Sequence, residues 1–325
     1  MINVAVIGVG YLGQFHAQKY NALPNAHLVA VCDVDIERAK CIAKESNVQA
    51  ISDYKTLVGQ VDAVSIVTPT PYHCEIGEFF LSNGVHVLME KPITTTIEEA
   101  DKLIAMAAAK NLVLQTGHLE RFNNAVTAVR PYLNKPRFIE STRLAPFKLR
   151  GTDVNVILDL MIHDIDLIQS MVDAEIEHID ASGSVVLSSS IDIANARIKF
   201  TNGCVANVTA SRISQRPERS LRIFQENNYL VIDLNHKRIA MHKKSDIDIH
   251  PGIPRMSRET FRFEKGDALL AQIQSFLECI ETGKAPEVCG LAGKKALETA
   301  IRITDIVNKN NARYHSPNQP DSHND

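Results

Sequence analysis

Two groups of residues combine types and spacing that could carry acid–base chemistry. Lys91 comes two residues after the short apolar run 86–89, and Asp159 and His163 lie four positions apart in a stretch with helical periodicity. Residues at this spacing share one face of a helix. Histidine titrates near neutrality and can accept a hydroxyl proton, while a lysine ammonium can stabilise a developing alkoxide. Such a set suits the oxidation of an alcohol that loses hydride from the same carbon.

Each of these residues also has a structural interpretation. His163 lies among apolar residues and could be a core histidine bonded to backbone, and 90–92 could be an ordinary turn after a strand. Lys91 could share the base role if burial lowers its pKa. The spacing of Asp159, His163 and Asp166 would also allow zinc, but no cysteine or second histidine completes a ligand set. We expect catalysis without a metal, with the division of roles left open.

A glycine-rich segment near the start of the sequence predicts a dinucleotide site. Gly8, Gly10 and Gly13 form a Gly-x-Gly-x-x-Gly fingerprint that follows a strand-like run and opens a helix-competent one. In this motif the glycines allow a tight turn, close approach of backbone to pyrophosphate, and close packing of helix on sheet. The amides and dipole at the helix N-terminus attract phosphate. We expect the intervening Tyr11 and Leu12 to contact the cofactor as well.

Asp33 indicates which dinucleotide binds. It ends the second strand-like run, 20 residues after Gly13, where an acid bonds the adenosine ribose hydroxyls. A carboxylate there repels a 2′-phosphate, and Val34 and Asp35 offer no cation to bind one. Arg38, one helical turn further, weakens this inference. We predict NAD, with NADP disfavoured.

The first 118 residues alternate short apolar runs with helix-competent stretches. Runs rich in β-branched residues and without helical periodicity are typical of buried parallel strands. Strands alternating with helices predict a doubly wound parallel sheet, the Rossmann fold. The expected strands are 3–8, 28–33, 63–67, 86–89 and 112–115. The first expected helix follows the glycines and ends near 22, and the others span 36–45, 74–81 and 97–110.

Several polar residues follow directly after these strands. Open α/β sheets bind ligands at the carboxyl ends of their parallel strands. We therefore expect this group to contact the cofactor and to include the residues nearest the nicotinamide. Its members are Thr68, Pro69, His73, Glu90 and Lys91.

The rest of the sequence predicts an α+β domain. Two runs of alternating apolar and polar residues, 191–200 and 204–212, flank Asn202-Gly203, a strong hairpin signal. We expect an open, mostly antiparallel sheet with one face solvated or paired to another subunit. Further strands are expected at 221–224, 229–234 and 238–242, and helices at 154–172 and 268–281. The predicted domains are 1–118, 119–289, a helix at 290–309 packing back on the first domain, and a flexible tail at 310–325.

The composition is that of a globular protein with room for two domains. The 325 residues are 45% hydrophobic and 22% charged, and the net charge of −3 gives no reason to expect a nucleic-acid or membrane partner. The six cysteines show no C-x-x-C pair, and no signal peptide or transmembrane run is apparent. We expect reduced thiols and a cytoplasmic protein.

Four motifs occur in a fixed order along the chain. They are the fingerprint with His16, the Thr68-Pro69 turn with His73, Glu90-Lys91-Pro92, and Asp159-x-x-x-His163-x-x-Asp166. Together they resemble the motifs of the glucose-fructose oxidoreductase, inositol dehydrogenase and rhizopine-catabolism (Gfo/Idh/MocA) family over nearly the whole chain. The resemblance implies an NAD-dependent dehydrogenase acting on CH–OH groups, with an open-faced sheet often used for subunit contacts. It also implies that Lys91 and His163 flank the reacting carbon of a sugar or polyol, with Asp159 close by.

Substrate contacts are expected near the helix that carries His163. The segments 143–147 and 159–164 are similar to segments of the family branch whose members oxidise UDP-N-acetylglucosamine at the 3-position. Family members often carry a glycine-rich stretch before this helix, and 151–156 departs from it, which puts local substrate contacts in doubt. Cations here would suit an anionic or nucleotide-linked sugar, although solvated surface charge explains them equally well. The candidates are Arg121, Arg143, Lys148 and Arg150, with Arg255 and Arg258 in a Pro-rich loop.

Two other functions stay open. The family resemblance also includes a sugar-sensing repressor that kept the fold and lost turnover, although intact Lys91, Asp159 and His163 argue against that role. Reduction of an unsaturated or imine substrate by bound NADH is the second. We expect a homodimer or homotetramer in each case.

Overall fold

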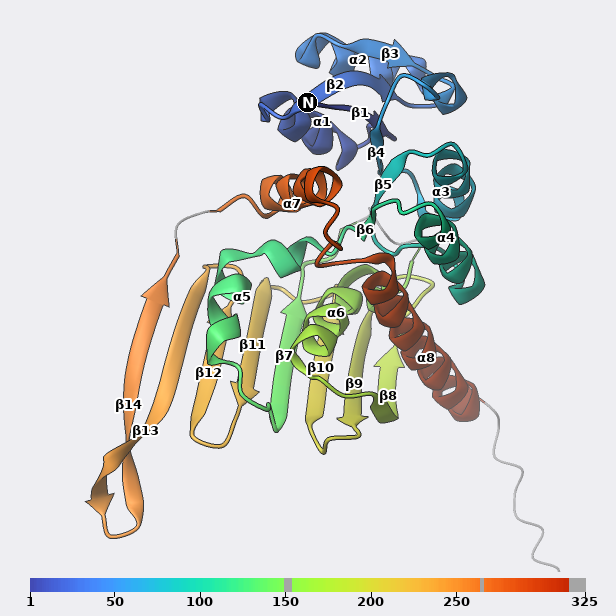
Figure 1. Cartoon of the computed structure of the whole chain (residues 1–325). Helices are drawn as coiled ribbons and strands as arrows, with labels where there is room; N and C mark the ends of the chain where they lie inside the picture. The colour runs from blue at the N-terminus through green and yellow to red at the C-terminus, as the bar shows by residue number, and fades with distance from the viewer. Residues whose placement is uncertain (149–153, 264–265, 316–325) are drawn as a thin grey trace, which may run out of the picture. The chain divides into compact units, whose positions relative to one another are not determined.

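The computed structural model describes residues 1–148, 154–263 and 266–315, which form two compact units (Figure 1). Unit 1 consists of Met1–Ala128 and Phe263–Glu298, and unit 2 of Val129–Arg262 with the chain from Thr299 onward. This division differs from the boundaries expected at 118 and 289. The reason is that a helix late in the chain packs into the core of the first unit.

Unit 1 contains a six-stranded sheet in the order β3-β2-β1-β4-β5-β6, with every neighbouring pair parallel. All four residues of β4 are buried, and since successive side chains point to opposite faces, both faces of this strand are covered. The predicted doubly wound Rossmann fold is confirmed. The strands are β1 (Ile2–Ile7), β2 (Ala26–Cys32), β3 (Gln49–Ile51), β4 (Ala63–Ile66), β5 (His86–Met89) and β6 (Leu114–Thr116).

Helices pack on this sheet in two groups. Residues of α1, α2 and α7 share one hydrophobic core with β1 and β2, and Ile273, Phe276 and Leu277 of α7 are fully buried in it. Helices α3 and α4 contact each other and the strands β5 and β6. The helices are α1 (Gly13–Ala22), α2 (Ile36–Ser46), α3 (His73–Ser82), α4 (Ile97–Ala109) and α7 (Ala268–Thr282), with short turns η1 (Tyr54–Leu57), η2 (Thr70–Tyr72) and η3 (Leu119–Phe122).

Unit 2 contains an eight-stranded sheet in the order β14-β13-β12-β11-β7-β10-β9-β8. Among the described strands of this sheet, only β10 and β7 pair in parallel, so the predicted mostly antiparallel sheet is confirmed. The strands are β7 (Phe138–Leu144), β8 (Ile176–Ser184), β9 (Ile193–Phe200), β10 (Val205–Ser211), β11 (Glu218–Phe224), β12 (Asn228–Asp233), β13 (Arg238–His250) and β14 (Ile253–Arg262).

One face of this sheet carries helices. Figure 1 shows α6 (Ile162–Met171) and the later part of α8 (Gly290–His315) on that face, and the Gln169 amide donates a 2.9 Å hydrogen bond to the Thr299 hydroxyl. The opposite face is polar: along β9, buried residues alternate with the exposed Asn195, Arg197 and Lys199. The remaining short helices are α5 (Asn124–Val129) and η4 (Arg130–Tyr132).

Strands β3, β7 and β8 were not predicted, and several predicted elements have different extents. The Pro-rich loop expected around Arg255 and Arg258 is strand β14, because it pairs with a β13 that is longer than expected. The helix expected from 154 begins at Ile157 with a π-helical turn, η5 (Ile157–Met161), before α6. Helix α8 continues to His315, past the expected start of the tail, since the residues beyond 309 are helix-compatible until Pro317, which disfavours helix before it.

None of the six cysteines forms a disulfide, and Cys32, Cys204 and Cys279 are buried. Within the described ranges, none of the helices has both the length and the apolar character needed to cross a membrane.

Candidate functional site

The glycine turn between β1 and α1 is shaped by close backbone contacts on two of its glycines. Gly8 has a φ of 86°, and a Cβ there would lie 2.8 Å from the Thr68 amide nitrogen. A Cβ on Gly13 would collide with the carbonyl oxygen of Gly8. Gly10 is different, because a Cβ there would meet nothing within 4 Å. The open space beside Gly10, near the N-terminus of a helix, is compatible with the pyrophosphate contact predicted from the sequence.

This difference predicts separate outcomes for two alanine substitutions. Gly13→Ala should destabilise unit 1 by about 1–3 kcal/mol, because the added methyl overpacks against backbone that cannot move away. Gly10→Ala should leave the free energy of unfolding within about 0.5 kcal/mol of wild type but weaken NADH binding about tenfold or more, because the methyl occupies the cradle. Urea unfolding and NADH fluorescence titration check both. Wild-type NADH affinity in Gly10→Ala would place the cofactor elsewhere.

Asp33 is held in position at the end of β2. It is 7% exposed, its Oδ2 accepts a 3.0 Å hydrogen bond from the Val9 amide, and its Oδ1 accepts one of 3.0 Å from the Asp35 amide. The bond to Val9 ties this carboxylate to the glycine turn. The Arg38 guanidinium lies 3.7 Å from Asp33 Oδ1 and 3.4 Å from Asp35 Oδ2, so its charge is shared between two acids.

His73 and Thr68 lie at the carboxyl end of β4. The ring of His73 is 1% exposed, and both of its nitrogens lie 2.9 Å from backbone carbonyl oxygens, Nε2 from Thr68 and Nδ1 from Pro92. Burial lowers the pKa of His73, and the two carbonyl acceptors and the charge of Glu90 act in the opposite direction. The buried Oγ1 of Thr68 makes no hydrogen bond to the described residues, so it can serve a ligand.

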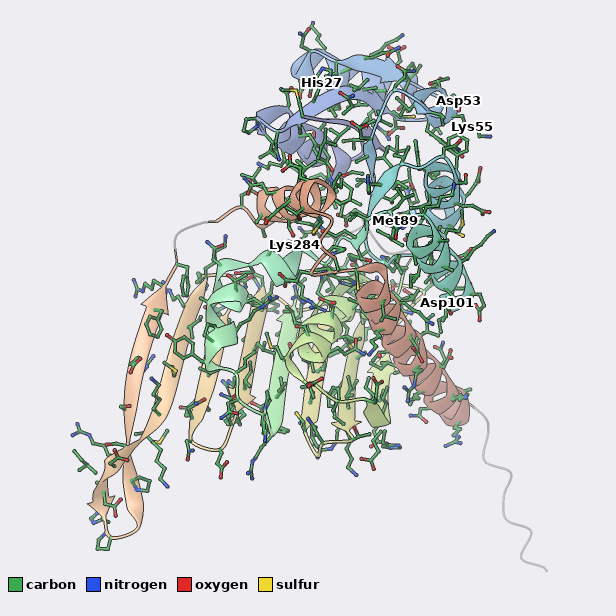
Figure 2. All side chains as sticks on the ribbon, viewed as in Figure 1. His27, Asp53, Lys55, Met89, Asp101 and Lys284 are labelled. Atoms are coloured by element: carbon green, nitrogen blue, oxygen red, sulfur yellow. The ribbon has the colours of Figure 1, made fainter. Side chains whose placement is uncertain are left out.

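Glu90 lies buried beneath the turn that carries Lys91. Its Oε1 accepts a 3.2 Å hydrogen bond from His16 Nε2, and its Oε2 accepts one of 3.2 Å from the Lys91 amide. Burial alone would raise the pKa of Glu90, but the His16 bond, aided by the charge of Lys91, holds it below its usual value. Gly117 has no room for a side chain, because a Cβ would lie 2.6 Å from the Glu90 carboxylate. Met89, the residue before Glu90, is fully buried, and its position is labelled in Figure 2.

Lys91 itself is half-buried and precedes a cis peptide bond to Pro92. It belongs to unit 1, whereas Asp159 and His163 belong to unit 2. Asp159 lies in the π-helical turn η5 and His163 in the first turn of α6, and both are half-buried. π-Helical turns occur frequently at functional sites. No group of three metal-ligating side chains occurs in the part of the chain that the structure describes.

Arg143 has a partner that the sequence did not reveal. Its Nε donates a 2.6 Å hydrogen bond to Asp164 Oδ2 and its Nη2 one of 3.2 Å to Oδ1, and the two side chains are 2% and 1% exposed. Arg143 and Asp164 therefore form a buried fork next to His163 in the sequence, and the substrate contact of Arg143 stays a prediction. Lys148 is exposed, Arg121 is buried in η3 of unit 1, and Arg150 lies outside the described residues.

A second buried ion pair, which was also not predicted from the sequence, lies beside the segment that leads into η5 and α6. Arg212 donates to Asp192 Oδ1 at 2.8 Å and to the Val154 carbonyl at 2.6 Å. Burial raises the pKa of Asp192, but bonds from the Ser188 amide and hydroxyl, from Arg212 and from the Val186 amide hold it well below its usual range. The partners are far apart in sequence, and no spacing rule could have paired them.

Comparisons with known proteins match both units. The family described as "Oxidoreductase family, NAD-binding Rossmann fold" matches residues 2–118, and the "GFO/IDH/MocA C-terminal domain" matches residues 132–231. The chain is 40% identical over 307 residues to UDP-N-acetylglucosamine 3-dehydrogenase of Acidithiobacillus ferrooxidans, covering 94% of this chain and 97% of that protein. Scyllo-inositol 2-dehydrogenase (NAD(+)) of Bacillus subtilis is 28% identical, covering 94% and 93%.

Solved structures agree with these matches. The structure of the Acidithiobacillus ferrooxidans enzyme superposes with a TM-score of 0.89 at 39% identity, covering 95% of this chain and 98% of that one. Levoglucosan dehydrogenase in complex with NADH has a TM-score of 0.85 at 19% identity, covering 95% and 97%, which indicates a common fold.

Proposed function

Because this chain belongs to the Gfo/Idh/MocA family of NAD-binding oxidoreductases, we propose that it oxidises the 3-hydroxyl of UDP-N-acetylglucosamine to a 3-keto group. The observation that carries this proposal is the 40% identity to an enzyme of that name over nearly the full length of both chains. The identity extends through both units, so it includes the unit that would recognise the sugar as well as the dinucleotide-binding unit.

The residues of unit 1 fit an NAD cofactor. The open space beside Gly10 suits the pyrophosphate, the positioned carboxylate of Asp33 suits the adenosine ribose, and the buried Thr68 Oγ1 has hydrogen-bonding capacity left for a ligand. When bound, NAD⁺ supplies the acceptor for the hydride that leaves the sugar carbon. Asp33 also disfavours the additional phosphate of NADP.

We assign the proton chemistry to Lys91 and His163. The imidazole of His163 takes the proton of the reacting hydroxyl, the role of general base that histidine fills most often in enzymes. The ammonium of Lys91 donates a hydrogen bond to the oxygen as it gains negative charge. Asp159 orients either the hydroxyl or His163 from the preceding turn. Each of these residues is half-buried, which strengthens electrostatic interactions while leaving an accessible side.

Initial rates of NADH formation with a panel of substrates test this function. We expect turnover of UDP-N-acetylglucosamine with NAD⁺ to exceed that with UDP-glucose, free N-acetylglucosamine and scyllo-inositol by about tenfold or more in kcat/KM, because a missing acetamido or nucleotide contact costs transition-state binding. NADP⁺ should support at most about a tenth of the NAD⁺ value. Turnover of inositols or free sugars alone would refute the proposal.

Two broader properties follow as proposals. The open, polar face of the unit 2 sheet and the family resemblance favour a homodimer or homotetramer, which light scattering after size-exclusion chromatography measures. Six cysteines without a disulfide favour a reducing compartment such as the cytoplasm.

A further inference from the structure

The loops after β4 and β5 lie next to each other where the parallel ladder ends. The last paired residues of these strands are Ile66 and Met89, and one more ladder bond follows, 3.0 Å from the Glu90 amide to the Ile66 carbonyl. Beyond it the two segments continue as the Thr68 loop and the turn that carries Lys91.

His73 spans these two segments. It begins α3, and its ring connects the Thr68 carbonyl, in the loop after β4, to the Pro92 carbonyl, in the turn after β5, at 2.9 Å each. Carbonyl oxygens only accept, so the ring donates to both of them only when both of its nitrogens are protonated; the two carbonyls and the charge of Glu90 favour that form, and burial opposes it. With both nitrogens directed at backbone and the ring 1% exposed, this side chain is poorly placed to contact a cofactor directly.

We propose that His73 is a positioning residue that fixes the Lys91 turn against the Thr68 loop. Its Nδ1 arm holds the turn that carries Lys91, and its Nε2 arm holds the loop that contributes Thr68 to the cofactor. The bond of Glu90 to the Lys91 amide, backed by His16, restrains the same turn from the other end. The two hydrogen bonds of the His73 ring, to the Thr68 and Pro92 carbonyls, are called the clamp below. The consequence for catalysis rests on the proposed function of Lys91, whereas the clamp itself does not.

The two arms can be removed one at a time. Asparagine places an amide nitrogen near the position of Nδ1, and glutamine places one near that of Nε2. His73→Asn therefore keeps the bond to Pro92 and loses the bond to Thr68, while His73→Gln does the reverse. His73→Leu removes both. His86→Leu is a matched control, because His86 lies at the opposite end of β5 and its Nδ1 also bonds backbone, accepting from the Val113 amide at 2.9 Å.

Hydrogen exchange measured by mass spectrometry on the full-length protein reads the clamp without using activity. We expect peptides covering 90–94 to exchange about tenfold faster in His73→Gln and at the wild-type rate in His73→Asn. Peptides covering 66–70 should show the opposite pattern. His86→Leu should leave both segments unchanged. Equal acceleration of both segments in the asparagine and glutamine variants, or no acceleration in His73→Leu, overturns the proposal.

The kcat and the NADH affinity of the same variants test what the clamp does for catalysis and for cofactor binding. His73→Gln should lower kcat by about tenfold or more while NADH affinity stays near wild type, because a displaced catalytic group costs rate more than binding. His73→Asn should weaken NADH binding and keep kcat within about threefold of wild type. A loss of the same size in both parameters for both variants contradicts the two-armed role. If the exchange pattern holds while Lys91→Met is fully active, the clamp stands and the proposed function fails.

Discussion

Replacing Lys91 by methionine should lower kcat for sugar oxidation by about a thousandfold, within the range that a positioned proton-transfer or oxyanion-stabilising group contributes. Methionine keeps an apolar stem of the same length as that of lysine up to Cε and lacks the terminal ammonium group. NADH affinity should change by less than about threefold, because the glycine turn and Asp33 are untouched. Steady-state rates and fluorescence titration measure the two quantities on the same preparation.

Lys102→Met is the matched control for Lys91→Met. Lys102 lies on α4 of the same unit and pairs with Glu78 at 2.8 Å on the surface. Loss of an exposed pair of this kind costs at most about 1 kcal/mol of stability, and kcat should be unchanged. Undiminished turnover in Lys91→Met would remove Lys91 from the mechanism. A wild-type protein that binds NADH but turns over no sugar would instead support the alternative of a sugar-sensing regulator without turnover.

Breaking the Arg143–Asp164 pair should produce the largest loss of stability. Asp164→Ala leaves the Arg143 guanidinium buried without this carboxylate, and removing one partner of a buried ion pair typically costs about 3–5 kcal/mol. The double variant Arg143→Met with Asp164→Leu should recover most of that loss, because two apolar side chains can replace a buried pair at little net cost. Urea unfolding of the two single variants and the double variant gives the coupling energy.

An exposed pair on the same strand provides the comparison. Glu140 of β7 lies 3.6 Å from Arg222, with 40% and 58% of the side chains exposed. Glu140→Ala should cost less than about 1 kcal/mol, since solvent screens the pair. Similar losses for Asp164→Ala and Glu140→Ala would show that burial does not set the value of the Arg143–Asp164 pair. Activity also reports on that pair, because Asp164 adjoins His163 on α6.

Local pattern was enough to predict most of the secondary structure. Runs such as 63–67 and 86–89 are apolar apart from Ser65 and His86, because both faces of a buried parallel strand are covered. The Asn202-Gly203 turn joins β9 to β10 as expected, with Gly203 at a φ of 84°. The strand β14 escaped prediction because its residues are largely exposed, so no alternation of buried side chains marks it.

Residue chemistry and order along the chain also determined the family and its cofactor, because a glycine turn, an acid after the second strand and a lysine after a later strand each have local causes. Only the tertiary structure decided which polar residues are restrained by protein partners. Arg143 turned out to bond Asp164, Glu90 to bond His16, and His73 to bridge two loops. Most buried polar groups find a hydrogen-bond partner, and folding alone selects which distant residue that is.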